Sequence, residues 1–163
     1  MAHSDMFLKV TSARSGVLSG ESRDKTFADQ IEVLDWSWGM SCPAAMDNTG
    51  SRTLLRELKI TKLADRASTG LMSLLNSNDN IKEVLLSVRK AAGTAPLTYW
   101  VLKLGKARLT DYAVQSSMSE TGAPVLTEHL SFAFKTVDIS YTPQLATGSG
   151  GGASTFTAET GAR

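Results

Sequence analysis

The chain has 163 residues, of which 42% are hydrophobic and 20% charged, and its 17 Lys and Arg against 16 Asp and Glu give a formal net charge of +1. This composition is that of a folded domain, and its even charge balance gives no support for long-range attraction to nucleic acid or anionic membranes. The single cysteine, Cys42, excludes an intrachain disulfide, so we expect a fold that can form in a reducing cytosol.

The N-terminal residues 1–7 lack both the positively charged segment and the apolar core of a secretory signal peptide. No segment reaches the roughly 18 consecutive apolar residues that a membrane-spanning helix needs, so we expect no membrane insertion. The sequence therefore predicts a protein that folds in the cytoplasm and, if it leaves the cell, is exported by other components.

Apolar and polar residues alternate with a period of two along most of the chain, which predicts strands. A first strand begins at Met6, and a loop rich in Ser, Gly and charged residues follows over residues 12–26. A second strand is predicted over residues 30–40. One of its faces carries Leu34, Trp36, Trp38 and Met40, and the opposite face carries Asp35, Ser37 and Gly39.

Apolar residues at helical spacing predict one α-helix over about residues 67–77, which Asp65 or Ser68 could cap. Further strands are predicted over residues 81–90, over 97–114 with a bend near Gly105, and over 125–141. In the last of these strands the apolar phase changes near Thr136, which predicts a bulge or a strand that changes sheets.

Many strands and one helix predict a mainly β fold, an antiparallel β-barrel or sandwich with one flanking helix. Residues 1–144 form this domain. Residues 145–163 are rich in Gly, Ser, Thr and Ala, so their composition predicts a flexible tail that contacts with a neighbouring subunit could order. Long strands with apolar residues in both phases need a second covered surface, which predicts an oligomer.

The sequence offers no constellation of catalytic, cofactor-binding or metal-binding residues. His3 and His129 have no companions at zinc-ligand spacing, Cys42 has no His nearby in sequence, and the Gly-rich residues 148–152 lack the Lys of a phosphate loop. We therefore predict that the protein is not an enzyme, needs no cofactor and does not bind nucleic acid.

Trp36 and Trp38 could form either a sugar-binding platform or a pair of core residues. Their shared phase with Leu34 favours the core, and we predict that these three residues anchor it together with Phe132 and Phe134. The rival interpretation is a secreted carbohydrate-binding sandwich, which requires a monomer with both tryptophans exposed.

Several segments together resemble the Hcp (hemolysin-coregulated protein) family of type VI secretion systems. The most specific are Gly-Glu-Ser at residues 20–22 and Trp-Ser-Trp-Gly at residues 36–39. Supporting segments lie at residues 5–10, 65–68, 88–93 and 127–144, in the order in which the family has them. The resemblance spans nearly all of residues 5–144.

The resemblance implies a compact β-barrel flanked by one helix, six copies of which form a ring, and rings that stack into a hollow tube. It also implies that a contracting sheath expels the tube with a spike at its tip, and that small effector proteins ride in the pore. Such a protein assembles in the cytoplasm and is then delivered outside the cell or into a target cell. On this basis we predict that Asp35, Ser37 and Gly39 line the pore and contact cargo.

The chain departs from the family in its longer turn at residues 12–19, its shorter loop at residues 42–53 and its tail after Gln144. Because such segments tend to touch the next ring, the resemblance does not define how rings stack. A tail-tube protein of a related phage-like or extracellular contractile injection system is an alternative that predicts the same ring.

Overall fold

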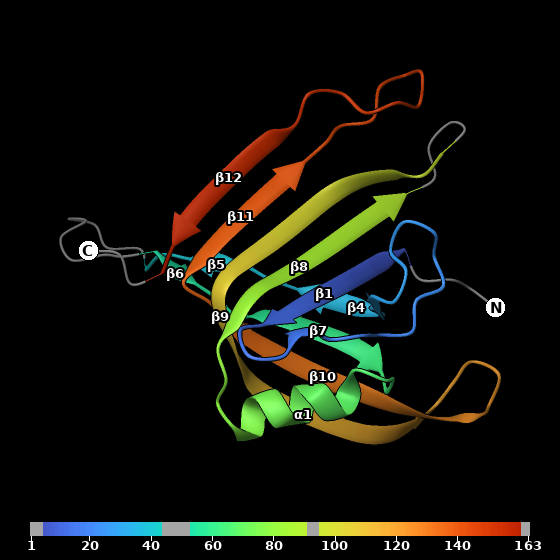
Figure 1. Cartoon of the computed structure of the whole chain (residues 1–163). Helices are drawn as coiled ribbons and strands as arrows, with labels where there is room; N and C mark the ends of the chain where they lie inside the picture. The colour runs from blue at the N-terminus through green and yellow to red at the C-terminus, as the bar shows by residue number, and fades with distance from the viewer. Residues whose placement is uncertain (1–4, 44–52, 91–94, 161–163) are drawn as a thin grey trace.

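A computed structural model describes residues 5–43, 53–90 and 95–160, which form twelve strands and one helix (Figure 1). All pairings between strands are antiparallel. The elements are β1 (Met6–Ser12), β2 (Gly16–Val17), β3 (Ile31–Glu32), β4 (Asp35–Ser37), β5 (Met40–Ser41), β6 (Leu54–Leu55), β7 (Leu58–Leu63), α1 (Ser68–Asn76), β8 (Ile81–Lys90), β9 (Leu97–Met118), β10 (Pro124–Ala133), β11 (Thr136–Tyr141) and β12 (Ser154–Glu159).

The strands build two layers that share one long strand. The first sheet runs β1-β8-β9-β11-β12, with the short strands β2 and β3 on the free side of β1. The second sheet runs β9-β10-β7-β4. The predicted mainly β antiparallel fold with one helix is confirmed. It is an open sandwich, and the closed barrel implied by the family resemblance is wrong, because among the described residues β4 and β12 each pair with a strand on one side alone.

The strand β9 passes from the first sheet to the second near its middle, as the predicted bend indicated. Gly105 still pairs with β8 and β11, whereas Arg108 pairs with β10. Lys106 between them adopts a positive φ of 49°. A Cβ on Gly105 would lie 2.3 Å from the Thr136 hydroxyl, so a larger residue at the corner would force the Thr136 side chain to move.

The predicted strand over residues 125–141 also changes sheets. Its first part is β10 in the second sheet, and its second part is β11 in the first sheet. The change occurs just before Thr136, which pairs with Gly105, so the two passages between layers lie side by side. The shift of apolar phase near Thr136 therefore predicted the sheet change correctly.

The predicted single strand over residues 30–40 is wrong. The segment contains three short strands: β3 pairs with β1, β4 with β7, and β5 with β6. The Val33 N–H donates to the Met6 carbonyl at 3.0 Å, and the next N–H, of Leu34, donates to the Thr61 carbonyl at 2.8 Å. The chain thus changes sheets at this point, which buries Val33 and leaves Leu34 48% exposed. Leu34 is therefore not a core anchor of this chain.

The helix α1 confirms the prediction for residues 67–77 and covers the inner face of the second sheet. Leu71 and Leu74 on this helix are buried. At its start, the Ser68 hydroxyl accepts a hydrogen bond from the Asp65 N–H at 2.9 Å, and the Asp65 carboxylate accepts one from the Ala67 N–H at 2.9 Å. The N-cap residue is Ala67 and α1 has no side-chain cap, so the prediction that Asp65 or Ser68 caps the helix is wrong; these two residues hold the turn that leads into it.

The segment with a tail-like composition, residues 145–163, contains an ordered strand. β12 pairs with β11 along its whole length and becomes the edge of the first sheet. Thr160 follows it, and its hydroxyl donates to the Phe134 carbonyl at 2.7 Å. The Thr and Phe residues of β12 favour strands, a local signal that the flanking glycines obscured.

Candidate functional site

No chemical centre is found among the described residues. No group of three or more His, Cys, Asp or Glu side chains in these segments could hold a metal ion. The ring of His129 is exposed and lies 3.3 Å from the Thr61 hydroxyl, and the exposed Cys42 thiol donates to the Pro43 carbonyl at 3.7 Å. His3 lies outside the described residues. No helix in the described segments is long and apolar enough to cross a membrane.

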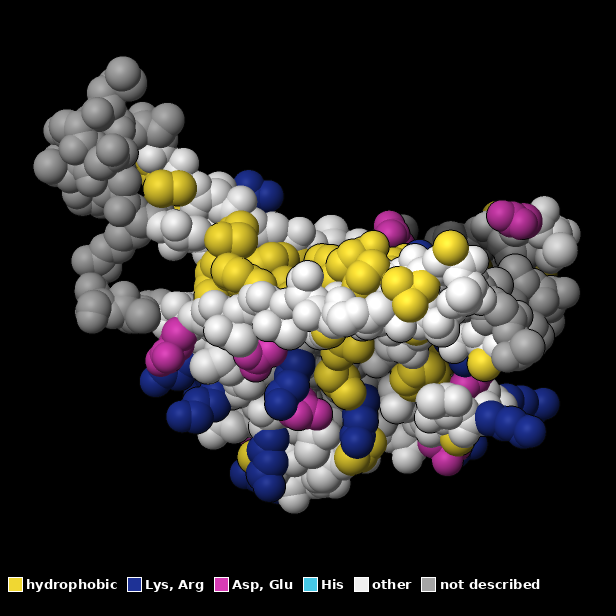
Figure 2. All heavy atoms as spheres, turned by 90° about the horizontal axis from the view of Figure 1, so that it is seen from above, with side chains coloured by type: hydrophobic (Ala, Val, Ile, Leu, Met, Phe, Trp, Pro, Cys, Tyr) yellow, Lys and Arg dark blue, Asp and Glu magenta, His cyan; other side chains and the backbone are white. Residues whose placement is uncertain are grey.

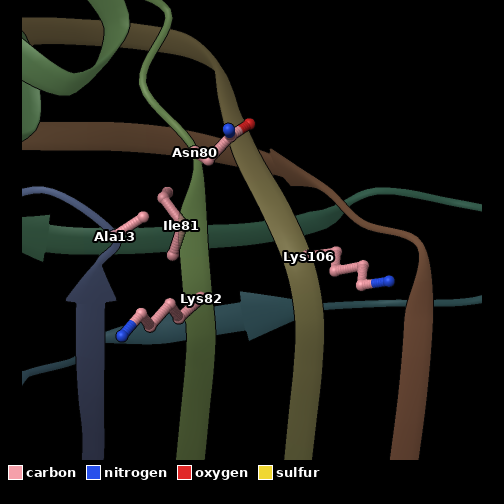
Figure 3. Close-up of a pocket in the computed structure, with 5 residues that line it drawn as sticks. All are labelled: Ala13, Asn80, Ile81, Lys82 and Lys106. Carbon is pink, nitrogen blue, oxygen red and sulfur yellow. The ribbon is translucent and has the colours of Figure 1, made fainter.

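Two hollows lie near the corner of β9. The first, of about 330 Å³, is lined by Ala13, Asn80, Ile81, Lys82 and Lys106. Its two lysine side chains point away from each other (Figure 3). The second, of about 320 Å³, is lined by Lys106, Arg108, Ala133, Phe134, Lys135 and Thr160. The residues that line the two hollows include no carboxylate, imidazole or thiol group, so neither hollow offers the ligands of a metal site.

The strand β4 separates the residues predicted for the pore from those predicted for the core. Asp35 and Ser37 are exposed on one face. Trp36 points to the other face, packs against the core and stacks on Trp100 with ring centroids 5.9 Å apart. Trp38, beyond the strand, also packs partly against the core. The other two predicted anchors, Phe132 and Phe134, are buried.

Gly39 lies beyond β4 in a more crowded position. Its carbonyl accepts a hydrogen bond from the Arg56 N–H at 2.9 Å. A Cβ at this position would lie 2.9 Å from a guanidinium nitrogen of Arg56. The structure therefore places Gly39 beside an arginine, at the end of the row that Asp35 and Ser37 begin.

Asp35 and Ser37 belong to a larger polar surface on the outer side of the second sheet. Asp35 pairs with Thr61, which in turn pairs with His129, and Ser37 pairs with Lys59. Strands β10 and β9 continue this surface, and the hydroxyls of Ser117 on β9 and Thr127 on β10 lie 2.7 Å apart. We call it the polar face; its members are Asp35, Ser37, Lys59, Thr61, Gln115, Ser117, Thr127 and His129.

Only Asp35 and Ser37 of the polar face were identified from the sequence. The other members lie on β7, β9 and β10, and the pairing of distant strands determines their place beside β4. The available signal was alternation: in β10, Thr127 and His129 are out of phase with the buried Glu128 and Leu130.

A buried ionic network supports the inner side of the same sheet. Lys62 and Glu128 are fully buried and form an ion pair. The Lys62 ammonium also donates to Asp65 at 2.9 Å and to the Ser68 hydroxyl at 3.4 Å. The Tyr112 hydroxyl donates to the second oxygen of Glu128. The network therefore joins β7, β9 and β10 to the start of α1.

The electrostatics of this network favour an ionised Glu128. Burial alone would raise the pKa of its carboxyl group, but hydrogen bonds from Lys62 and Tyr112 bring that pKa below its usual value. Burial, together with the neighbouring Glu128 carboxylate, raises the pKa of Tyr112. Tyr112 therefore stays protonated and remains a donor to Glu128.

A second cluster, centred on Arg89, fastens the loop that carries the Gly-Glu-Ser segment. The Arg89 guanidinium bonds to Asp24 in the loop and to Asp5 at 3.2 Å. It also lies over the rings of Phe7 and Phe27, which stack with centroids 4.5 Å apart. The hydrogen bond from Arg89 lowers the pKa of Asp24. We call these residues the Arg89 clasp.

The glycine of the Gly-Glu-Ser segment has a steric role at the base of this loop. A Cβ on Gly20 would lie 2.4 Å from the Gln30 carbonyl oxygen, so the two strands of the loop can approach only with glycine there. The Ser22 hydroxyl is buried and accepts the Asp24 N–H at 3.2 Å. The motif thus shapes the loop and presents Asp24 to Arg89.

Comparison with known proteins gives one consistent family. A family model described as type VI secretion system effector, Hcp, matches residues 7–141. The chain is 33% identical to the Pseudomonas aeruginosa protein named Protein hcp1 over 148 residues. This aligned region covers 88% of this chain and 86% of that protein.

Solved structures of related proteins share the fold. A type VI secretion system effector from Yersinia pestis matches with a TM-score of 0.70 at 24% identity, over 95% of this chain and 99% of that one. Hcp1 from Salmonella typhimurium matches with a TM-score of 0.73 at 24% identity, over 95% of both chains.

Proposed function

The chain belongs to the Hcp family of type VI secretion system proteins, and from this membership we propose that it is the tube subunit of such a system. Six copies close into a ring, and the rings stack into a hollow tube. A contracting sheath expels this tube, with a spike at its tip, from the cytoplasm to the outside or into a target cell. The match over residues 7–141 carries the proposal, because it spans both sheets and the helix.

The polar face supports a placement in the channel wall. Most side chains on this side of the sheet are small or polar, and the charges at Asp35 and Lys59 balance each other. Leu63, which pairs with Thr127 on the same side, is an exposed apolar side chain among them. A surface of this kind is hydrated and has no large apolar patch that would bind a passing protein tightly. A small effector can therefore be carried and released. We place Asp35, Ser37 and Gly39 in this lining, with Gly39 at its rim beside Arg56.

The ring itself is tested by the mass of the purified full-length chain. Size-exclusion chromatography with light scattering should give six times the mass of one chain, and electron microscopy of the same sample should show annular particles. A strict monomer at high concentration would contradict the tube proposal.

The pore placement is tested by Ser37→Gln, which adds bulk to the polar face. We expect unchanged rings and a several-fold loss of the small proteins that co-purify with rings from the native bacterium, measured by quantitative mass spectrometry. Thr157→Gln, on the outer face of β12, is the matched control and should retain cargo. If Ser37→Gln breaks the ring instead, the residue lies at a subunit contact and the pore placement is wrong.

A further inference from the structure

The second hollow near the corner of β9 is lined by three cations. Lys106 and Arg108 belong to β9, and Lys135 lies between β10 and β11. The uncharged lining residues are Ala133, Phe134 and Thr160. The volume of about 320 Å³ lies at the lower end of the roughly 300–1,000 Å³ that is typical of small-molecule pockets. The hollow therefore has the size for a small ligand and a lining that favours an anion.

No carboxylate group in the described segments neutralises these three cations. Over one side of the molecule, Lys and Arg side chains are interspersed with those of Asp and Glu (Figure 2). Lys103 on β9, for example, forms an ion pair with Glu83 at 3.7 Å. Lys106, Arg108 and Lys135, in contrast, form no ion pair with a described residue. Three like charges around a concave surface attract ligands of the opposite charge, because the field is concentrated there.

Hydrogen bonds hold the groups that line this hollow. The Lys135 N–H donates to the Gly105 carbonyl at 3.1 Å, and the Thr160 N–H donates to the Lys135 carbonyl at 2.7 Å. The Arg108 guanidinium donates to the Asn78 carbonyl at 3.2 Å. This bond uses one of the five N–H donors of the guanidinium and orients the group, so the other donors are available to a ligand.

Lys106 adopts a backbone conformation that disfavours residues with a Cβ. Its φ is 49°, in the left-handed region that glycine occupies most readily. Figure 3 shows its side chain pointing away from Lys82 and toward the passage between β10 and β11, where Lys135 lies. Lysine is less favourable for folding at this position than glycine would be, which indicates that the side chain serves a function.

We propose that this hollow binds the phosphate group of a small soluble ligand, a phosphate monoester or a diphosphate. The planar guanidinium of Arg108 can donate two parallel hydrogen bonds to a pair of phosphate oxygens, and the two lysine ammonium groups add point charges. A phosphate monoester carries about 1.5 to 2 negative charges at pH 7, whereas a carboxylate carries one, so three cations favour the phosphate group. The inference is independent of ring formation, because one chain supplies the whole site.

Isothermal titration calorimetry of the full-length chain with sodium pyrophosphate tests this site. With the ionic strength held constant by NaCl, we expect saturable binding of one pyrophosphate per chain. The melting midpoint should rise with it, because a ligand that binds only the folded state stabilises that state. Lys135→Met should weaken the binding by at least about tenfold, since it removes a charge-assisted hydrogen bond. Lack of saturable binding to the parent chain would overturn the proposal.

Lys106→Gly separates binding from folding. Without ligand, its melting midpoint should equal or exceed that of the parent, because glycine adopts a positive φ without strain. Its affinity for pyrophosphate should nevertheless fall by at least about tenfold. Lys82→Met is the matched control, since it removes the same charge from the neighbouring hollow, and it should retain the parental affinity. Parental affinity in Lys106→Gly, or an equal loss in Lys82→Met, would show that the ion does not bind in this hollow.

A second arm distinguishes a soluble ligand from a lipid headgroup. Glycerol phosphate should compete with pyrophosphate in the titration, and the chain should stay in solution when phosphatidylcholine vesicles that contain phosphatidate are sedimented. Binding to these vesicles that Lys106→Gly abolishes would overturn the assignment to a soluble ligand and would indicate a phospholipid headgroup instead.

Discussion

The buried Lys62 network and the Arg89 clasp use similar ion pairs in different surroundings. Lys62 and Glu128 are sealed from solvent, whereas in the clasp the Asp24 and Asp5 side chains reach the surface. A buried charge that loses its partner cannot be rescued by water, while an exposed one can. Loss of an ion pair should therefore lower the free energy of unfolding more in the Lys62 network than in the Arg89 clasp.

The largest effect is expected when Lys62 is replaced by Met. Glu128 then has no cation in a sealed site, where it must either stay charged without a partner or take up a proton, and the loss of the pair should lower the free energy of unfolding by about 3–5 kcal/mol. Urea denaturation at a fixed protein concentration measures this loss. Lys59→Met, at an exposed position of the same strand, is the control and should stay within about 0.5 kcal/mol of the parent.

Replacing Arg89 by Met should cost less, about 1.5–3 kcal/mol, because charged hydrogen bonds of this kind contribute amounts in that range. Asp24 can turn to water once the guanidinium is gone. Proteolysis should cut the loop at residues 20–30 faster in this variant. A loss equal to that of Lys62→Met would contradict the distinction between the two regions.

Removing Lys62, Glu128 and Tyr112 together should cost less than removing Lys62 alone. The triple substitution Lys62→Met, Glu128→Met and Tyr112→Phe leaves no unpaired charge or hydroxyl among these three positions. It should therefore recover most of the stability lost in Lys62→Met alone, since apolar residues of similar size often replace a buried ion pair at little cost. If the triple variant is less stable than the single one, the interactions within the network contribute more to the free energy of unfolding than the burial of its charges costs.

Mild acid should produce the smallest effect. The folded-state pKa of Glu128 lies below its unfolded value, so its contribution to stability is fully present above the unfolded pKa of about 4.3 and is lost as the pH falls through the folded pKa. Chemical denaturation between pH 7 and pH 3 should show the decline only in the lower part of this range. In Glu128→Gln the decline should be shallower; an identical slope would show that other carboxyl groups cause it.

Local patterns in the sequence predicted the elements that lie inside the fold, between other elements. The helix follows from apolar residues at helical spacing, and the bend near Gly105 follows from a glycine inside a strand pattern. The sheet change near Thr136 follows from a change of apolar phase, which marks a change of covered face. The open edges were harder to predict. β12 lies in a Gly-rich segment, and only its pairing with β11 makes it a strand.

The segment around Trp36 shows why the candidate site was predicted in part. Residues 30–40 have the alternation of one strand, but their hydrogen bonds go to three different partner strands, β1, β7 and β6, which no local pattern reveals. Lys62 shows a second limit. Lys62 is in phase with the buried residues Leu58 and Ile60, which indicates an inward side chain. A lysine is buried there only when groups from distant segments pair with its ammonium group.

The corner where both chain passages cross between the layers has a mechanical consequence. β9 crosses at Lys106, and the chain from β10 to β11 crosses beside it, where the Lys135 N–H donates to the Gly105 carbonyl at 3.1 Å. A load applied to the polar face therefore reaches the opposite sheet through two continuous peptide backbones, as well as through side-chain packing. Sliding of one layer over the other would have to change the backbone torsions and break hydrogen bonds at both crossings, so this corner ties the two layers together.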